Sequence, residues 1–461
     1  MTDPHSGSAA PRRRTAFAEG AEQLRAAATT EPGRLRIIGA LLALLVVAFG
    51  AVTAWQTSER AAAADDVIER SQPLTSDAAA IYVSLADANT AAASGFLAEG
   101  QEPPAVRDRY EDDIATAARK LTTAAANSKG SGTASAEIAK LNALLPEYAE
   151  RIETARTYNR QGLPLGGAYL RNANDLMQTE MLPAAKELYD AEKERLGADY
   201  DAAKSYPWAA IALGLLALAA LVWAQRRNYR RTNRVFNLGL VTATGTAAAV
   251  LLWLLAGHTL AFTALGDSYD HGIRSLNVLN DARISTLQAR SNENLTLVAR
   301  GAVTVPDDGR PNAGQDKYDV DYRARMRELG DGGVDRAGMG TLGEALHHAD
   351  DETGRAPVEK AMAAVEEWQQ RHEAAREADT QGDYEKALDR VIGDDDATGE
   401  SFDRADKALE EAVEHEQQDF RGAAEDGRGA MTGLPVGAAA VAVLGAAGAV
   451  LGIGRRLSEY R

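Results

Sequence analysis

The stretch IAKLNALLPEYAERIETARTYNRQG at 138–162 returns as VEKAMAAVEEWQQRHEAAREADTQG at 358–382. An aromatic residue stands at the same point of both copies, Tyr148 in the first and Trp368 in the second, and arginines follow it three and eight positions later. Upstream, RDRYEDDIATAARKL and QDKYDVDYRARMREL form a second matched pair in the same order. Two matched pairs in one order indicate an internal duplication, and a repeated unit sets the architecture of a chain.

Apolar stretches flank both copies. They cover residues 37–55, 207–224, 237–262 and 430–453. Each stretch approaches the roughly 20 apolar residues that a helix needs to cross a hydrocarbon core about 30 Å thick. We therefore predict four transmembrane helices, with the longer polar segments 56–206 and 263–429 between them.

Arginine clusters predict which side of the membrane each segment occupies. They lie in 1–36, in the loop 225–236 and in 454–461. The loop carries Arg226, Arg227, Arg230, Arg231 and Arg234. The positive-inside rule places these three segments, and with them both termini, in the cytoplasm, so both polar segments are predicted to be extracytoplasmic. The loop joins the two copies, and we expect it to be the output point for a cytoplasmic partner.

The charge is divided unevenly along the chain. The formal net charge is −17, with about −8 on the first polar segment, about −18 on the second and about +9 on the cytoplasmic pieces. An acidic exterior argues against nucleic acid as a partner and against docking of the outer segments on anionic lipid. The chain contains no cysteine, so neither disulfides nor thiol chemistry is expected.

Both polar segments are predicted to be helical, because they are rich in Ala, Glu, Lys, Arg and Leu and show no strand-like alternation. Breaks divide each segment into helices. The predicted breaks are Gly100–Pro104, Ser128–Thr133 and Gly162–Gly167, then Gly301–Gly314, Gly330–Gly343 with Gly354–Pro357, and Gly382 with Gly393–Gly399. Both ends of each segment return to the membrane, so we predict an all-α membrane protein with two extracytoplasmic antiparallel four-helix bundles.

The residues matched between the two copies have a structural and a functional interpretation. The aromatic ones are Tyr110, Tyr318, Tyr148 and Trp368. They could line a ligand pocket, but matched aromatics on a bundle seam more often belong to the core, and we predict that role. Gly162 and Gly382 end the matched stretches and are predicted to be helix C-caps.

Motifs for catalysis and cofactor binding are lacking, so we expect neither an enzyme nor a cofactor. His347 and His348 stand beside Asp350 and Asp351, but adjacent residues on a helix point about 100° apart, which disfavours a metal site. Residues 394–399 begin like a calcium loop and lack the glutamate at its twelfth position, so we expect a solvated loop. His258, within the third apolar stretch, is either a functional group at membrane depth or a residue at the outer boundary.

Helical modules joined directly to membrane helices resemble the four-helix-bundle sensor domains of bacterial chemoreceptors and histidine kinases. The chain lacks the long cytoplasmic coiled coil and the kinase core of those families. With four apolar stretches, two outer helical segments and an Ala- and Arg-rich composition, it is more similar to the GlnX-type membrane proteins of actinobacteria. That resemblance implies work with an amino-acid-binding lipoprotein outside the cell and a cytoplasmic Ser/Thr protein kinase.

These observations predict a transmembrane sensor that relays an external small molecule, or a ligand-loaded solute-binding lipoprotein, to a cytoplasmic kinase or adaptor. The resemblance implies an amino acid such as glutamine, glutamate or aspartate. The duplication supplies two bundles in one chain, a pseudo-dimer that leaves further homodimerisation open. A non-switching scaffold of the cell envelope is the alternative, because the cytoplasmic pieces are too short to form an output domain.

Overall fold

The computed structural model describes residues 31–98, 101–127, 132–232, 238–267, 272–307, 312–330, 340–349, 351–393, 395–431 and 433–457. Within them the protein is almost entirely helical and has no strand, only an isolated bridge between Thr304 and Asp316. The all-α part of the prediction is therefore confirmed. Three apolar helical stretches among these residues are long enough to cross a membrane, and a shorter one covers Ala439–Leu451, which is compatible with a membrane protein.

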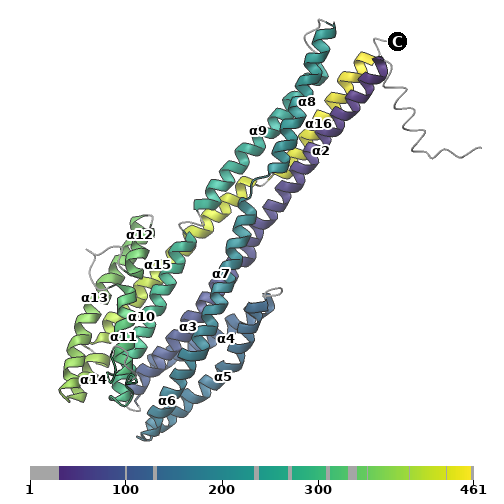
Figure 1. The fold of residues 1–461 in the computed structure, drawn as a ribbon. Helices are drawn as coiled ribbons and strands as arrows, with labels where there is room; N and C mark the ends of the chain where they lie inside the picture. Colours follow the sequence, from purple (N-terminus) through teal and green to yellow (C-terminus); the bar gives the residue numbers. More distant parts are fainter. Residues whose placement is uncertain are drawn as a thin grey trace, which may run out of the picture. The chain divides into compact units, whose positions relative to one another are not determined.

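The chain forms two compact units, and each is described by itself. We call residues Met1–Ala61, Ser205–Ala261 and Ala430–Arg461 the apolar unit, and Ala62–Lys204 with Phe262–Gly429 the polar unit. Within the polar unit, Ala62–Lys204 is the first module and Phe262–Gly429 the second module. Helices are numbered as in Figure 1.

The apolar unit contains the apolar helices. They are α2 (Glu31–Asp66, up to Ala61), α8 (Trp208–Thr232), α9 (Leu238–Asp267, up to Ala261) and α16 (Leu434–Leu457). Val46, Leu221 and Ala243 pack together in their core. Large apolar side chains such as Leu252 (67 % exposed) and Leu444 (66 % exposed) face outward. Soluble proteins rarely expose a large contiguous apolar patch, so these outward-facing leucines are compatible with contact with lipid.

The first module is a set of long helices connected by short turns. It comprises η1 (Val67–Ser71), α3 (Gln72–Leu97), α4 (Pro104–Asn127), α5 (Gly132–Arg160), α6 (Leu165–Leu176), η2 (Met177–Met181) and α7 (Leu182–Lys204). Helix α3 packs against α4 and α7, and α5 packs against α4, α6 and α7. The three breaks predicted in this segment follow the ends of α3, α4 and α5, although Gly100 and residues 128–131 lie outside the described residues.

Among its described residues, the second module has two more helices than predicted, and residues 308–311 and 331–339 of the predicted breaks lie outside them. It comprises α10 (Arg274–Ala299), α11 (Lys317–Leu329), α12 (Thr341–His348), α13 (Glu352–Thr380), α14 (Tyr384–Ile392) and α15 (Thr398–Met431). The break predicted at Gly354–Pro357 is wrong. Asp351 caps α13 by accepting the backbone N–H of Gly354 at 2.7 Å, and the first turn tolerates glycine because its N–H groups lack helical partners. Pro357 follows in the second turn, where it removes one hydrogen bond without ending the helix.

Both modules share one core in the polar unit, with α3 and α10 packed against each other at its centre. The core includes Leu85 and Tyr148 from the first module and Leu287 and Trp368 from the second. Nearly every residue of α10 from Leu279 onward is buried, polar residues included. The polar side chains of a helix that is buried on all sides must find hydrogen-bond partners within the protein. The α3–α10 contact therefore concentrates polar interactions in the core.

Candidate functional site

The contact between α3 and α10 is polar. Asn89 Nδ2 donates to Ser291 Oγ at 2.8 Å, and Asn294 Nδ2 donates to Ser94 Oγ at 2.7 Å. Thr90 Oγ1 lies 2.9 Å from the Leu287 carbonyl oxygen and 3.0 Å from that of Ala86. These side-chain bonds set the register of α3 against α10, and a different register would require new partners for each of them.

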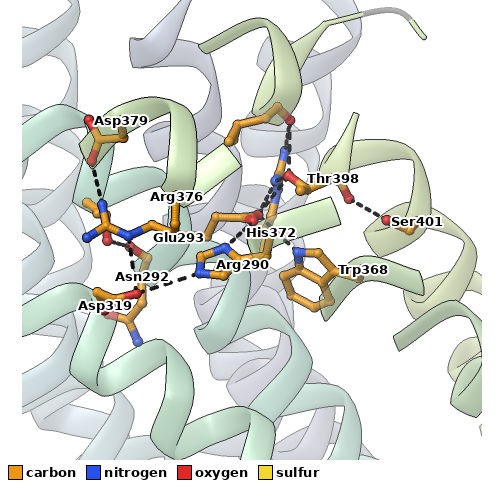
Figure 2. Close-up of polar contacts among 12 residues, drawn as sticks. Arg290, Asn292, Glu293, Asp319, Trp368, His372, Arg376, Asp379, Thr398 and Ser401 are labelled. Atoms are coloured by element: carbon orange, nitrogen blue, oxygen red, sulfur yellow. Dashed lines mark hydrogen bonds and ion pairs between the residues drawn. The ribbon is translucent and has the colours of Figure 1, made fainter. Parts of the chain in front are cut away.

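Glu293 of α10 is the hub of a buried ionic network in the second module (Figure 2). Its Oε2 accepts from Trp368 Nε1 at 3.1 Å and from Thr398 Oγ1 at 3.0 Å, and Arg290 donates to the same oxygen. Its Oε1 lies 2.8 Å from His372 Nδ1. Groups from α10, α13 and α15 therefore converge on one carboxylate that is only 2 % exposed.

The network continues from His372 to α11. His372 Nε2 faces Asp319 Oδ1 at 3.6 Å, and Arg376 Nε lies 3.4 Å from the same oxygen. The imidazole also stacks on the Tyr322 ring with centroids 3.7 Å apart. A row of alternating charges, visible in Figure 2, thus joins α10, α13 and α11.

The charged forms of this row support one another. Burial opposes ionisation of Glu293, but Arg290 and His372 lower its pKa below the ordinary value. Burial also opposes a charge on His372, yet its contacts with Asp319 and Glu293 raise its pKa. The pKa of Asp319 is lowered against burial by His372 and the neighbouring arginines. Removing one member would leave a buried charge without its partner, which is costly.

A cleft of about 940 Å³ lies between the two modules. Its walls come from α3, α4, α10 and α15 and include Asp87, Asp113 and Phe402. The volume falls in the range of small-molecule sites. Both modules contribute to the walls, so a molecule bound in the cleft would contact both copies of the duplicated segment.

Arg109 of α4 bridges the modules in this cleft. Its guanidinium lies 2.8 Å from Asp87 in the first module, and 2.9 Å from Asp406 and 3.3 Å from Asp403 in the second. Arg283 of α10 also pairs with Asp406, at 2.8 Å. Asp87 and Asp406 are buried, so their attraction to the arginines is screened less by solvent than that of a surface pair.

Arg290 connects the cleft to the buried network. Its side chain lines the cleft, while its guanidinium donates to Glu293, to Thr398 Oγ1 at 2.7 Å and to the Val391 carbonyl at 3.0 Å. A change in the cleft that moves Arg290 would therefore alter the hydrogen bonds of Glu293.

The matched aromatic residues all lie in the core, between 0 % and 4 % exposed. Tyr148 Oη donates to Asn89 Oδ1 at 3.3 Å, and Trp368 donates to Glu293, so both reach a polar residue of a central helix. The Arg156 guanidinium lies 4.2 Å from the Tyr110 ring centroid. Gly162 and Gly382 follow α5 and α13 with φ of +67° and +81°, a conformation that favours glycine.

The predicted output arginines are described only in part. Arg226, Arg227 and Arg230 lie in the last turns of α8, where the Arg227 guanidinium stands 5.3 Å from the Trp223 ring centroid. Arg231 belongs to the same helix, and its side chain lies outside the described residues, as does the whole of Arg234.

The histidine pair lies in α12, with ring centroids 5.6 Å apart. Among the described residues, which exclude Asp350 and Asp394, the group that could hold a metal ion is a different one. It consists of Asp351, His415 and Asp419, whose candidate ligand atoms lie within 4.8 Å of one another. Asp351 already serves as the cap of α13, and the two aspartates are exposed.

His258 of the apolar unit is buried, at 5 % exposed. Its ring stands edge-on to that of Tyr206, with centroids 4.6 Å apart. The sequence leaves the role of His258 open, and its placement within the apolar unit gives it an aromatic neighbour without assigning a function.

Residues 63–201 match the family of actinobacterial sensor domains. The match covers almost all of the first module, including Asp87, Arg109 and Asp113 of the cleft. No curated protein and no solved structure is significantly similar to the chain. The sensor-domain match indicates a sensor role.

Proposed function

We propose that the protein is a membrane sensor whose two helical modules lie outside the cytoplasmic membrane and whose signal leaves through a cytoplasmic partner. One observation carries the proposal. The sensor-domain match falls on the module that shares a polar, ion-paired interface with the second module. A sensor needs two arrangements that a ligand can distinguish, and a ligand shifts the equilibrium by its difference in affinity for the two.

The interface suits such a change. Its hydrogen bonds join short polar side chains, and its ion pairs share carboxylates, as Asp406 does between Arg109 and Arg283. A typical coupling free energy between two sites is about 1–3 kcal/mol, which the exchange of one or two such contacts can supply. A change of packing between the modules would then reposition the helices that lead to the membrane.

The topology is part of the proposal. Four membrane-spanning helices, α16 among them, would hold both modules on the outer side and the arginine-rich loop 225–236 on the inner side. The duplicated bundles would form a pseudo-dimer within one chain. By its resemblance to GlnX-type proteins, the outer partner is an amino-acid-loaded solute-binding lipoprotein and the inner one a Ser/Thr protein kinase.

Labelling tests the topology directly, because the native chain has no cysteine. Glu111→Cys and Glu366→Cys place thiols at exposed positions of the two modules, and Arg230→Cys places one at the end of α8. A membrane-impermeant maleimide should label the first two in intact cells and the third only after lysis. Labelling of either module site only after lysis would refute the proposal.

The output step has its own test. Replacing Arg226, Arg227 and Arg230 by glutamine should weaken recruitment of the kinase while leaving capture of the lipoprotein intact. The matched control is Arg119→Gln, which removes one exposed arginine from α4 of the first module. Unchanged recruitment in correctly inserted protein would remove the loop from the mechanism, and recruitment without any dependence on the external ligand would favour the scaffold.

A further inference from the structure

The cleft between the modules has more carboxylates than cations. Its acidic lining residues are Asp87, Asp113, Glu400, Asp403, Asp406 and Glu410, and its basic ones are Arg109, Arg283, Arg290 and Lys407. Two of these charged residues pair with residues that do not line the cleft. Arg290 pairs with Glu293, and Glu400 pairs with Arg371 at 2.8 Å. Five carboxylates then remain against three cations.

The deficit is concentrated at Asp87 and Asp113. Asp87 is 6 % exposed, and a single N–H of Arg109 serves both of its oxygens, with Nε 3.0 Å from Oδ2 and 2.8 Å from Oδ1. Asp113 Oδ2 is buried and accepts no hydrogen bond from an N–H or O–H donor, and its carboxyl group interacts with that of Asp87. Burial and the neighbouring Asp87 raise the pKa of Asp113 to about 8. Ionisation of the buried Asp87 disfavours ionisation of the half-buried Asp113 beside it, so the pair holds a proton where a cation could bind.

We propose that this cleft binds a small organic molecule through a primary ammonium group, and that Asp87 and Asp113 are the residues that accept it. An ammonium group carries three N–H donors, which match carboxylate oxygens that share one donor or lack one. It would replace the proton held by the carboxylate pair and supply one of the two positive charges that the cleft lacks. The proposal rests on the sensor function above and gives its ligand a chemical class.

The surroundings argue against other ligand classes. The side chains of Arg109 and Arg283 are already paired with carboxylates, so an anion would have to displace them and face the remaining acidic residues. A quaternary ammonium has no N–H and is usually held by aromatic faces. The aromatic ring in the cleft, Phe402, already has the Arg109 and Arg290 guanidinium groups at 5.6 and 5.7 Å from its centroid.

A four-carbon charge series tests the class. Calorimetry on the purified full-length protein would compare 1,4-diaminobutane with 1,4-butanediol and succinate at matched ionic strength. We expect saturable binding of the diamine alone. Absence of saturable diamine binding, or equal binding of succinate, would overturn the proposal.

Variants locate the site. Asp113→Asn keeps the Asp87–Arg109 pair and should weaken diamine binding at least tenfold, as should Asp87→Asn. Asp112→Asn, on the exposed face of α4, is the matched control and should change affinity less than twofold. Helicity and thermal unfolding of each variant would be recorded, and Asp113→Asn decides the outcome if Asp87→Asn is unstable. Unaltered binding by folded Asp113→Asn would overturn the assignment.

Proton release provides a second readout. The groups facing Asp113 are Asp87 of α3, Arg109 of α4, Tyr148 of α5, Arg283 of α10, and Asp403 and Asp406 of α15. Diamine affinity should rise by up to about tenfold per pH unit below pH 8, as one proton leaves the pair. Asp113→Asn should flatten this dependence. These results concern binding alone, so their failure would leave the topology and output tests of the sensor function unaffected.

Discussion

The two modules place an aromatic residue at the same point of the repeat and use it differently. In the first module Tyr148 donates to the neutral side chain of Asn89, whereas in the second Trp368 donates to the charged Glu293. The aromatic positions have kept their place against the central helices while the interior around them diverged in polarity. At this matched position the second module therefore depends on paired charges, whereas the first has a neutral hydrogen bond.

Replacing Glu293, the hub of the ionic network, should cause the largest loss of stability. Glu293→Gln leaves Arg290 and His372 without their counter-charge, and breaking a buried pair costs about 3–5 kcal/mol. Urea unfolding of the full chain, with hydrogen exchange followed for α13 and α5 separately, measures this loss. Protection should fall in α13 far more than in α5. Equal loss in both helices would show that the modules do not differ in this way.

Removing the bridge between the modules should have an intermediate effect. Arg109→Gln leaves buried Asp87 and Asp406 with fewer partners, and unsatisfied buried groups cost about 1–3 kcal/mol. The lower end applies because a third of the Arg109 side chain is exposed to solvent. Exchange in α4 and α15 should increase together, with Arg119→Gln as the control. A change confined to α4 would indicate that the bridge does not couple the modules.

Removing the neutral hydrogen bond of Tyr148, the counterpart of Trp368 in the first module, should cause a smaller loss of stability. Tyr148→Phe removes one hydroxyl and its bond to Asn89, which amounts to about 1 kcal/mol. The same urea titration would compare it with Glu293→Gln. If the two variants lost equal stability, the ionic contacts of Glu293 would contribute no more to folding than the neutral hydrogen bond of Tyr148.

A change of pH should have the smallest effect on stability, and the effect should differ between the two modules. The raised pKa of His372 gives the second module a contribution to stability that is complete below 6.5 and is lost as pH rises through that pKa. The lowered pKa of Glu293 adds a contribution present above 4.5 and lost as pH falls through the folded value. His372→Gln should abolish the alkaline loss of protection in α13. In the first module, Asp113 stays protonated in the folded state up to about pH 8 but ionises above 3.8 in the unfolded chain, so stability should fall as pH rises between these values, and Asp113→Asn should remove that slope.

Periodicity and composition predicted the helices, because those signals are local. A break was wrongly predicted at Gly354–Pro357, because capping by Asp351 outweighs the residue preferences of glycine and proline. The cleft could not be predicted, because Arg109 meets Asp406 across 297 positions of sequence and no local pattern records that contact. The sequence did contain one signal for the buried ionic network. Arg290 and Glu293 stand three residues apart, a spacing at which opposite charges on one helix can pair.

The claim that packing between the modules carries the signal is tested most directly by locking α3 to α10. Ser94→Cys and Asn294→Cys replace two side chains that hydrogen-bond at 2.7 Å, in a chain without other cysteines. The measurement is the phosphorylation response of the proposed cytoplasmic kinase to the proposed external amino acid in cells. We predict that oxidation of the double variant abolishes the response, that reduction restores it and that each single variant responds normally. A full response with the disulfide quantitatively formed would contradict the account.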